Sequence, residues 1–160
     1  MTPRQRYDAV QHLMPDADMT LIGDEIKWLD DRPMPNDVDI EAAHGVVVLD
    51  TARTIALKRA KAKHADALKA VKDRYPQTEI DGWSELVGDA KEGEGVCIEA
   101  YAAQLGISVP DACERVLTVR EGYRAAYGEA TGELTKTRDL IDNAETVEDL
   151  EAIHWPETKP

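Results

Sequence analysis

Residues 53–76 read RTIALKRAKAKHADALKAVKDRYP. Five side chains recur here at spacings of three, four, three and four: Leu57, Ala60, His64, Ala67 and Val71. This heptad pattern is typical of a helix that packs one face against another helix. A proline disfavours helical geometry in the residue before it, so Tyr75-Pro76 should stop the helix. We therefore expect a long helix over 46–74.

A second long helix is expected over 110–143. Its apolar seam skips the charged Glu133 and comprises Ala112, Val116, Val119, Tyr123, Ala126, Ala130, Thr137, Leu140 and Ala144. Shorter helices are expected over 79–93 and 95–105, separated by glycines, and a last short helix should be capped by Thr146. We predict that the two long helices pack antiparallel, with the shorter ones between them.

The first 35 residues predict a separate small unit. Thr2 and Pro3 suit the start of a helix over 3–14, and Gly23-Asp24 separates two apolar runs as in a β-hairpin. A proline-containing linker over 30–36 leads to a short helical run that Gly45 should interrupt. The expected fold is mainly α: a helix and β-hairpin head over 1–35, followed by a helical body over 36–160.

Composition excludes several classes of protein. The 160 residues contain no Phe, 5% aromatics and a net charge of −13, which fits helices with alanine-rich seams better than a β-sandwich. No apolar run reaches the ~18–20 residues that a membrane helix requires, and the chain start lacks an apolar signal core. We expect a cytosolic protein in which Cys97 and Cys113 are buried free thiols.

Charge is distributed unevenly along the chain. Residues 53–74 contain eight basic and two acidic side chains, so they carry +6 and the rest of the chain carries −19. This segment suits three interpretations: a solvated helix face, a docking face for an acidic partner, or a nucleic-acid surface. The third is disfavoured, because the segment has no interleaved aromatics and acidic surroundings repel a phosphate backbone.

Motifs that carry chemistry are not found. The phosphate-loop, dinucleotide-binding and nucleophile-elbow patterns are absent from the sequence, and the four histidines lie in four different segments. His64 lies in a helix seam, where a core or interface role is more common than catalysis. We therefore predict a protein that is not an enzyme and that needs no cofactor or metal.

The joint after the first long helix carries two large aromatics, Tyr75 and Trp83, within nine residues. Pro76 should end one helix, and Glu79 and Asp81 place negative charge near the start of the next, as the helix dipole favours. Two interpretations remain open: a joint packed internally, or a corner that binds a partner, since Trp and Tyr dominate the energetics of interfaces.

This joint resembles a recurrent corner in small proteins of tailed bacteriophages and prophages. In those proteins Tyr-Pro, Glu and Trp lead into a helix with the pattern W-x-x-Q-x-x-E-A. Here Tyr75-Pro76, Glu79, Trp83 and Asp89-Ala90 match, whereas Leu86 replaces the usual Gln. The chain's Trp155-Pro156 is similar to the Trp-Pro with which tail-fibre assembly chaperones often finish.

The head resembles the PBSX-type prophage tail-associated family. The similarity rests on Tyr7-Asp-Ala, on Leu13-x-Pro-Asp and on Ile26-x-Trp28 in the expected hairpin. Together the resemblances imply a non-enzymatic chaperone of tail-fibre assembly in the host cytoplasm or, alternatively, a minor component of the virion's tail tip or baseplate. The implied partner is a tail-fibre or other tail protein.

Contact with a partner is the function that these observations favour. Large aromatics and exposed cations supply the candidate binding residues: Trp28, Tyr75, Trp83, Trp155, Lys61 and Lys69. For each aromatic, a place in the core is the more common alternative. Association of two copies is also left open, because the helix seams can be satisfied within one chain or between two.

Overall fold

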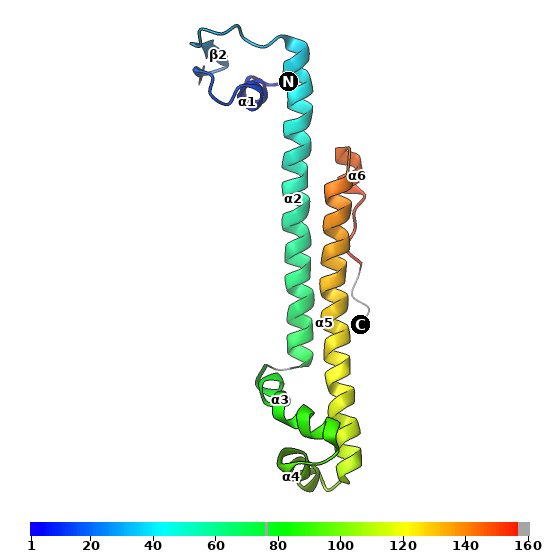
Figure 1. The fold of residues 1–160 in the computed structure, drawn as a ribbon. Helices are drawn as coiled ribbons and strands as arrows, with labels where there is room; N and C mark the ends of the chain where they lie inside the picture. The colour runs from blue at the N-terminus through cyan, green and yellow to red at the C-terminus, as the bar shows by residue number, and fades with distance from the viewer. Residues whose placement is uncertain (76, 157–160) are drawn as a thin grey trace. The chain divides into compact units, whose positions relative to one another are not determined.

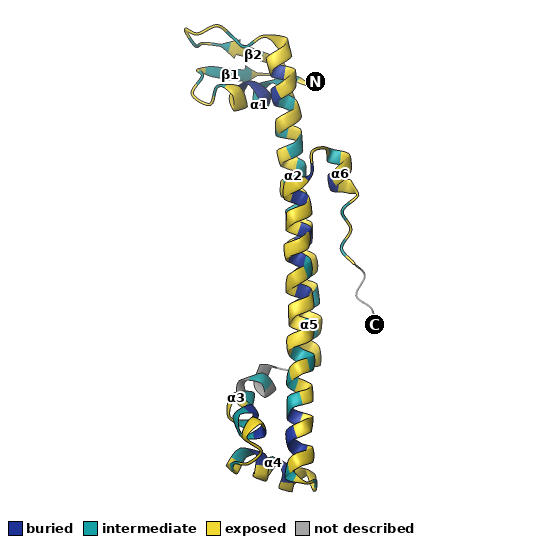
Figure 2. Cartoon of the chain, turned by 45° about the vertical axis from the view of Figure 1, so that its right-hand side comes forward, coloured by how far each residue is buried: buried dark blue, intermediate teal, exposed yellow. Residues whose placement is uncertain are grey.

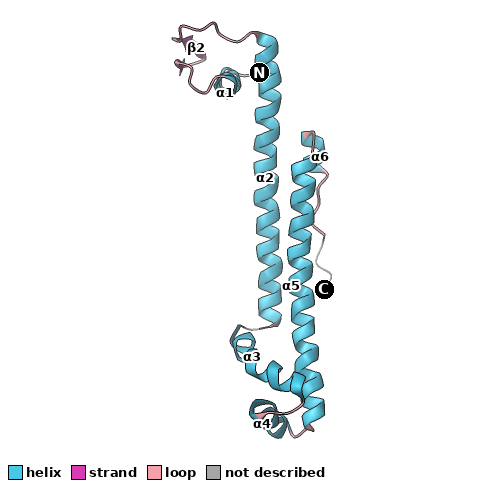
Figure 3. Ribbon diagram, viewed as in Figure 1, coloured by secondary structure: helices cyan, strands magenta, loops and turns pink. Residues whose placement is uncertain are grey.

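The computed structural model describes residues 1–75 and 77–156, with the side chains of 77–79 and 81 excepted. Its elements are α1 (Pro3–Leu13), β1 (Met19–Ile22), β2 (Glu25–Trp28), α2 (Asp37–Arg74), α3 (Gln77–Glu92), α4 (Val96–Leu105), α5 (Val109–Asn143) and α6 (Val147–Glu151). The expected mainly α fold, with one small hairpin near the N-terminus and two long helices, is confirmed (Figures 1 and 3).

The chain forms two compact units. The first contains Met1–Arg59 and Asp139–His154, and the second contains Ala60–Arg138 and the stretch that begins at Trp155. Both long helices therefore contribute to both units. The proposed division into a head over 1–35 and a body over 36–160 stays a prediction.

In the first unit, α1 and the hairpin form as their sequences indicate. The Thr2 hydroxyl accepts a hydrogen bond from the Gln5 backbone N–H at 3.2 Å, and the Gln5 side chain accepts one from the Thr2 N–H. The strands pair antiparallel with Met19 opposite Trp28. Gly23 has a φ of +60°, a conformation that glycine adopts at little cost and that the two-residue turn requires.

The start of α2 differs from the expectation, because the helix begins at Asp37 and continues through Gly45. Asn36 caps it by accepting a 2.9 Å hydrogen bond from the Asp39 N–H. Ile40 and Ala43 are buried with Ala9 and Val10 of α1. A mid-helix glycine costs only about 1 kcal/mol, so the cap and this packing keep the helix continuous.

The first unit also contains the end of α5 and the short α6. Thr146 caps α6 as predicted: its hydroxyl accepts from the Asp149 N–H at 3.1 Å, and Asp149 accepts from the Thr146 N–H at 2.9 Å. Hydrogen bonds from the Thr146 side chain are the main cause of a lowered pKa for Asp149. Leu150 is buried, and the Arg53 guanidinium donates to the Ala144 carbonyl at 2.7 Å.

In the second unit, α3, α4 and the first turns of α5 enclose a small apolar core (Figure 2). Its fully or nearly fully buried members are Val87, Ala90, Ile98, Ala102, Ala112, Cys113 and Val116. Asp89 of α3 joins two of these helices, because its carboxylate accepts hydrogen bonds from the N–H groups of Cys97 and Ile98 at 2.9 and 3.3 Å.

Both cysteines are free thiols, and only Cys113 is buried. The expectation of a buried Cys97 is wrong, because its side chain lies at the partly exposed start of α4, near Glu85. Desolvation, followed by the negative charges of Asp89 and Glu85, raises the pKa of the Cys97 thiol.

The predicted seam of α5 is confirmed at Ala112, Val116, Ala130 and Ala144, which are buried, but it is wrong at two positions. Val119 and Leu140 were expected inside but are 38% and 49% exposed, whereas Leu134 and Ile141 are buried. Thr137 is buried as predicted. An α-helix has 3.6 residues per turn, so the buried face passes directly from Ala130 to Leu134. Glu133 therefore does not interrupt the buried face of α5.

The ends of the joint are partly described. The helix α2 ends at Arg74, as predicted, and the Tyr75 N–H still donates to the Val71 carbonyl at 2.9 Å. The predicted roles of Pro76 and of the Glu79 and Asp81 side chains lie outside the described residues.

Candidate protein-interaction site

Three aromatic rings from three elements meet in the second unit. Tyr75 follows the last turn of α2, Trp83 lies in α3, and Tyr123 lies in α5. Their ring centroids are 5.7–6.3 Å apart, and each pair is close to perpendicular. This edge-to-face geometry stabilises aromatic contacts beyond the effect of burial alone. Tyr127, one helical turn after Tyr123, extends the group, which we call the aromatic cluster.

The cluster is buried at one end and exposed at the other. Tyr75 is buried, whereas Trp83 and Tyr123 are half-buried and Tyr127 is 46% exposed. The Arg74 guanidinium lies 5.4 Å from the centroid of the Tyr75 ring, a distance that suits a cation–π contact. The cluster thus both fixes the end of α2 and presents aromatic surface to solvent.

A groove of about 620 Å³ lies next to Tyr75, between α2 and α5 of the second unit. Small side chains dominate its walls: Ala67, Ala70 and Val71 from α2, and Ala126 and Ala130 from α5. Trp155 and Pro156 close part of it. We call this the alanine groove. Its small residues leave room for apolar side chains of another polypeptide.

Charged groups lie at the rim of the alanine groove. Arg74 contributes a cation, while Glu129 and Glu133 contribute carboxylates. Lys136 is 3.9 Å from Glu133 across an exposed surface, a pair that stabilises by less than about 1 kcal/mol. An apolar centre with a polar rim is the usual composition of a protein-binding site.

The six predicted contact residues occupy four settings. Tyr75 and Trp83 are brought together in the aromatic cluster, and Trp155 lines the alanine groove beside Tyr75. Lys61 and Lys69 are exposed on α2 of the same unit. Trp28 belongs to the other unit and has no part in the cluster.

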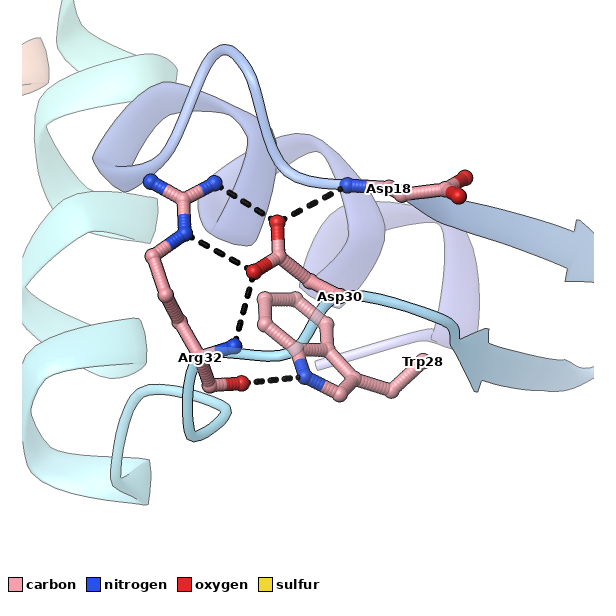
Figure 4. Close-up of polar contacts among 4 residues, drawn as sticks. All are labelled: Asp18, Trp28, Asp30 and Arg32. Atoms are coloured by element: carbon pink, nitrogen blue, oxygen red, sulfur yellow. Dashed lines mark hydrogen bonds and ion pairs between the residues drawn. The ribbon is translucent and has the colours of Figure 1, made fainter.

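Trp28 has a structural role in the head (Figure 4). Its indole N–H donates to the Arg32 carbonyl at 2.7 Å, and its ring packs against the head core. Asp30 bonds the Arg32 guanidinium at 2.6 and 2.8 Å and also accepts from the Asp18 N–H. The Arg32 contacts hold the pKa of the Asp30 carboxyl far below its usual range. These bonds fix the segment that follows the hairpin.

A second groove, in the first unit, has a volume of about 720 Å³. It lies between the end of α1, the segment that contains Pro33 and Pro35, and the first turns of α2. Met14, Met34 and Val46 make its lining apolar. Flexible methionines can adapt to ligands of different shape, but no described residue indicates what would occupy this groove.

The described part of the chain offers no arrangement typical of a metal site, since no three His, Cys, Asp or Glu side chains converge there. Likewise, none of the described helices combines the length and apolar character needed to cross a membrane. His64, at the α2 seam, has a buried Nε2 that finds no hydrogen-bond partner among the described atoms. The surfaces that stand out are therefore apolar or charged contact surfaces.

Sequence reasoning missed Tyr123 and Tyr127 as site residues. It placed Tyr123 only in the seam of the second long helix and did not relate it to the joint. The available signal was the i, i+4 spacing of the two tyrosines, which puts both rings on one helix face. The contact of Tyr123 with Tyr75 depends on how α2 and α5 pack, and spacing alone does not determine that.

No protein-family model, curated protein or solved structure matches this sequence. The features of the molecule that bear on its function are the alanine groove, the aromatic cluster and the surface charge.

Proposed function

We propose that this protein binds another polypeptide without catalysing a reaction, and that it is a chaperone for the assembly of bacteriophage tail fibres. The observation that carries the proposal is the alanine groove beside the half-exposed aromatic cluster. Aromatic side chains next to a small apolar groove are typical of the anchoring regions of protein interfaces. The resemblance of the joint to small proteins of tailed phages, and of Trp155-Pro156 to tail-fibre chaperones, supports the choice of client.

The chemistry of such a client fits the groove. Fibre chains expose apolar surface and unpaired strand edges before they assemble, and these surfaces promote aggregation. A helical protein with a net charge of −13 can cover such a surface and keep the complex in solution by charge repulsion. In this proposal it acts in the host cytoplasm during tail assembly.

Co-expression with a tail-fibre protein encoded next to it tests this proposal. We expect the native chain to raise the soluble yield of the fibre and to co-purify with it. The variant Ala70→Arg places a long charged side chain in the groove and should abolish both effects. Ala125→Arg, at an exposed position of α5 outside the groove lining, is the matched control. The proposal fails if the native chain changes neither yield nor co-purification.

A second candidate is a minor structural component of the tail tip or baseplate. Large apolar side chains that are exposed outside the groove support it, because a permanent assembly would bury them; they include Val48, Ile55, Val119 and Leu140. Mass spectrometry of purified particles separates the two candidates. A structural component stays in the particle, whereas a chaperone is absent or strongly depleted.

A further inference from the structure

Three exposed lysines of α2 share one side of the helix in the second unit. With 100° per residue, Lys61, Lys69 and Lys72 fall within an arc of about 80°. At 1.5 Å per residue they extend over about 16 Å of the helix axis. All three are exposed. We call this set the lysine stripe.

The lysine stripe forms no ion pair with the described part of its own chain. The ion pairs found among the described residues involve none of the three lysines. Two exposed carboxylates of the same helix, Asp66 and Asp73, lie three residues before and four residues after Lys69 and offset part of its charge. The stripe therefore presents three cations without a direct ion pair, in a chain whose residues outside 53–74 carry −19.

Two exposed alanines lie among the lysines. Ala65 is placed between Lys61 and Lys69 along the helix, and Ala62 follows Lys61 directly. Small side chains let a second helix approach closely. The lysines around them can then reach carboxylates of that helix without a bulky residue holding the two backbones apart.

We propose that the lysine stripe docks an acidic α-helix of the client polypeptide. To match the charges of the stripe, the docked helix must carry three carboxylates with the same spacing as the lysines. They are separated by eight and then three residues, or by three and then eight if the helix runs in the opposite direction. The helix would lie on Ala62 and Ala65, and its carboxylates would pair with Lys61, Lys69 and Lys72. This inference rests on the proposed function only in that the partner is a polypeptide; it does not depend on a fibre.

Nucleic acid fits the stripe less well than an acidic helix. Strong duplex binding typically uses about six to ten phosphate contacts, and the stripe supplies three cations. The surrounding chain is strongly acidic and repels the phosphates that would lie beyond the stripe.

The test uses the full-length protein, isotope-labelled for NMR, and synthetic helical peptides. Two alanine-rich probes carry three glutamates at the stripe spacing, one in each order along the peptide. A control peptide has the same composition with its glutamates distributed around the helix. We expect amide shifts confined to 61–72 for at least one probe, with affinity about tenfold higher than for the control peptide.

Two charge-reversal variants locate the interaction. Lys61→Glu with Lys69→Glu should weaken probe binding by about tenfold or more. Arg59→Glu with Lys63→Glu makes the same change in net charge on the other side of α2 and should change affinity by less than about threefold. Circular dichroism of both variants confirms that the exposed substitutions leave the helices folded.

Three results would overturn the inference: equal binding of probe and control peptides, equal loss in the two variants, or tighter binding of a short DNA duplex than of the probes. The co-expression experiment is independent of all three. If the probes do not bind but the fibre is still rescued, only the proposed role of the lysine stripe is refuted. If the probes bind but the fibre is not rescued, the fibre is not the client and the proposed role of the lysine stripe stands.

Discussion

At the level of single residues, the geometry of the aromatic cluster depends on the close approach of Tyr75 to α5. A Cβ added at Gly122 would lie 2.7 Å from the Tyr75 hydroxyl oxygen, closer than atoms in folded proteins normally pack. Tyr75 cannot easily retreat, because Trp83 and Tyr123 pack against its ring. Glycine at this position therefore allows the end of α2 to approach α5.

We predict that Gly122→Ala destabilises the protein by about 1–3 kcal/mol, as overpacking usually does. Gly128→Ala is the matched control on the same helix, since a Cβ there meets nothing within 4 Å. It should stabilise by up to about 1 kcal/mol through helix propensity. Urea denaturation followed by circular dichroism measures both changes. Equal stability of the two variants would contradict the proposed contact.

The bonds around Asp30 predict a pH dependence of the head. A carboxyl whose folded-state pKa is lowered stabilises the fold above its ordinary pKa of 3.8, and this contribution is lost as the pH falls further. The indole N–H resonance of Trp28, which reports the bond to Arg32, should therefore stay unchanged just below that value and shift only as the pH approaches the much lower folded-state pKa of Asp30. In Asp30→Asn the shift should already be present at neutral pH.

Asp31→Asn is the control for this experiment, since Asp31 is an exposed neighbour with the same charge. It should keep the neutral-pH spectrum of the native chain. If Asp30→Asn and the native chain gave the same Trp28 resonance over the whole range, Asp30 would not hold this segment.

At the level of elements, the sequence predicted the helices better than their faces. Capping residues set the starts of α1 and α6, and Gly106 sets the end of α4, through local hydrogen bonds that the neighbouring sequence reveals. In a 35-residue helix such as α5, a small error in the assumed number of residues per turn adds up along the chain. The predicted buried face then drifts away from the real one. The predicted seam is right at most of the buried positions, but it wrongly includes Val119 and Leu140 and omits the buried Leu134 and Ile141.

Asp89 provides the element-level prediction, because it caps α4 from a different helix. Gly95, at the N-cap position, has no side chain to accept from the first N–H groups, and the Asp89 carboxylate replaces it. Asp89→Ala should cost about 1–2 kcal/mol and speed hydrogen exchange at the Cys97 and Ile98 amides. Glu92→Ala, an exposed change near the end of α3, should do neither. Unchanged exchange in Asp89→Ala would contradict the cap.

For the whole molecule, the candidate site could be predicted only in part. Tyr75 and Trp83 were recognisable because both lie in one short joint. Trp155 is separated from them by more than 70 residues of chain, and the alanines of the groove come from two helices. Pattern reasoning recognises what lies within one element, whereas a groove between elements depends on tertiary packing. The residue types alone could not assign Trp28 to a structural role in the head.

The C-terminal stretch yields a prediction for the molecule as a whole. Trp155 lines the alanine groove of the second unit, although the preceding Asp139–His154 belongs to the first. Ending the chain after His154 removes this wall and uncovers apolar surface. We expect a loss of about 1–2 kcal/mol of unfolding free energy and stronger binding of a hydrophobic dye. A chain ending after Pro156 retains the wall and should behave like the native protein. If the two truncated chains were equally stable and bound equal amounts of dye, Trp155 would contribute nothing to the groove.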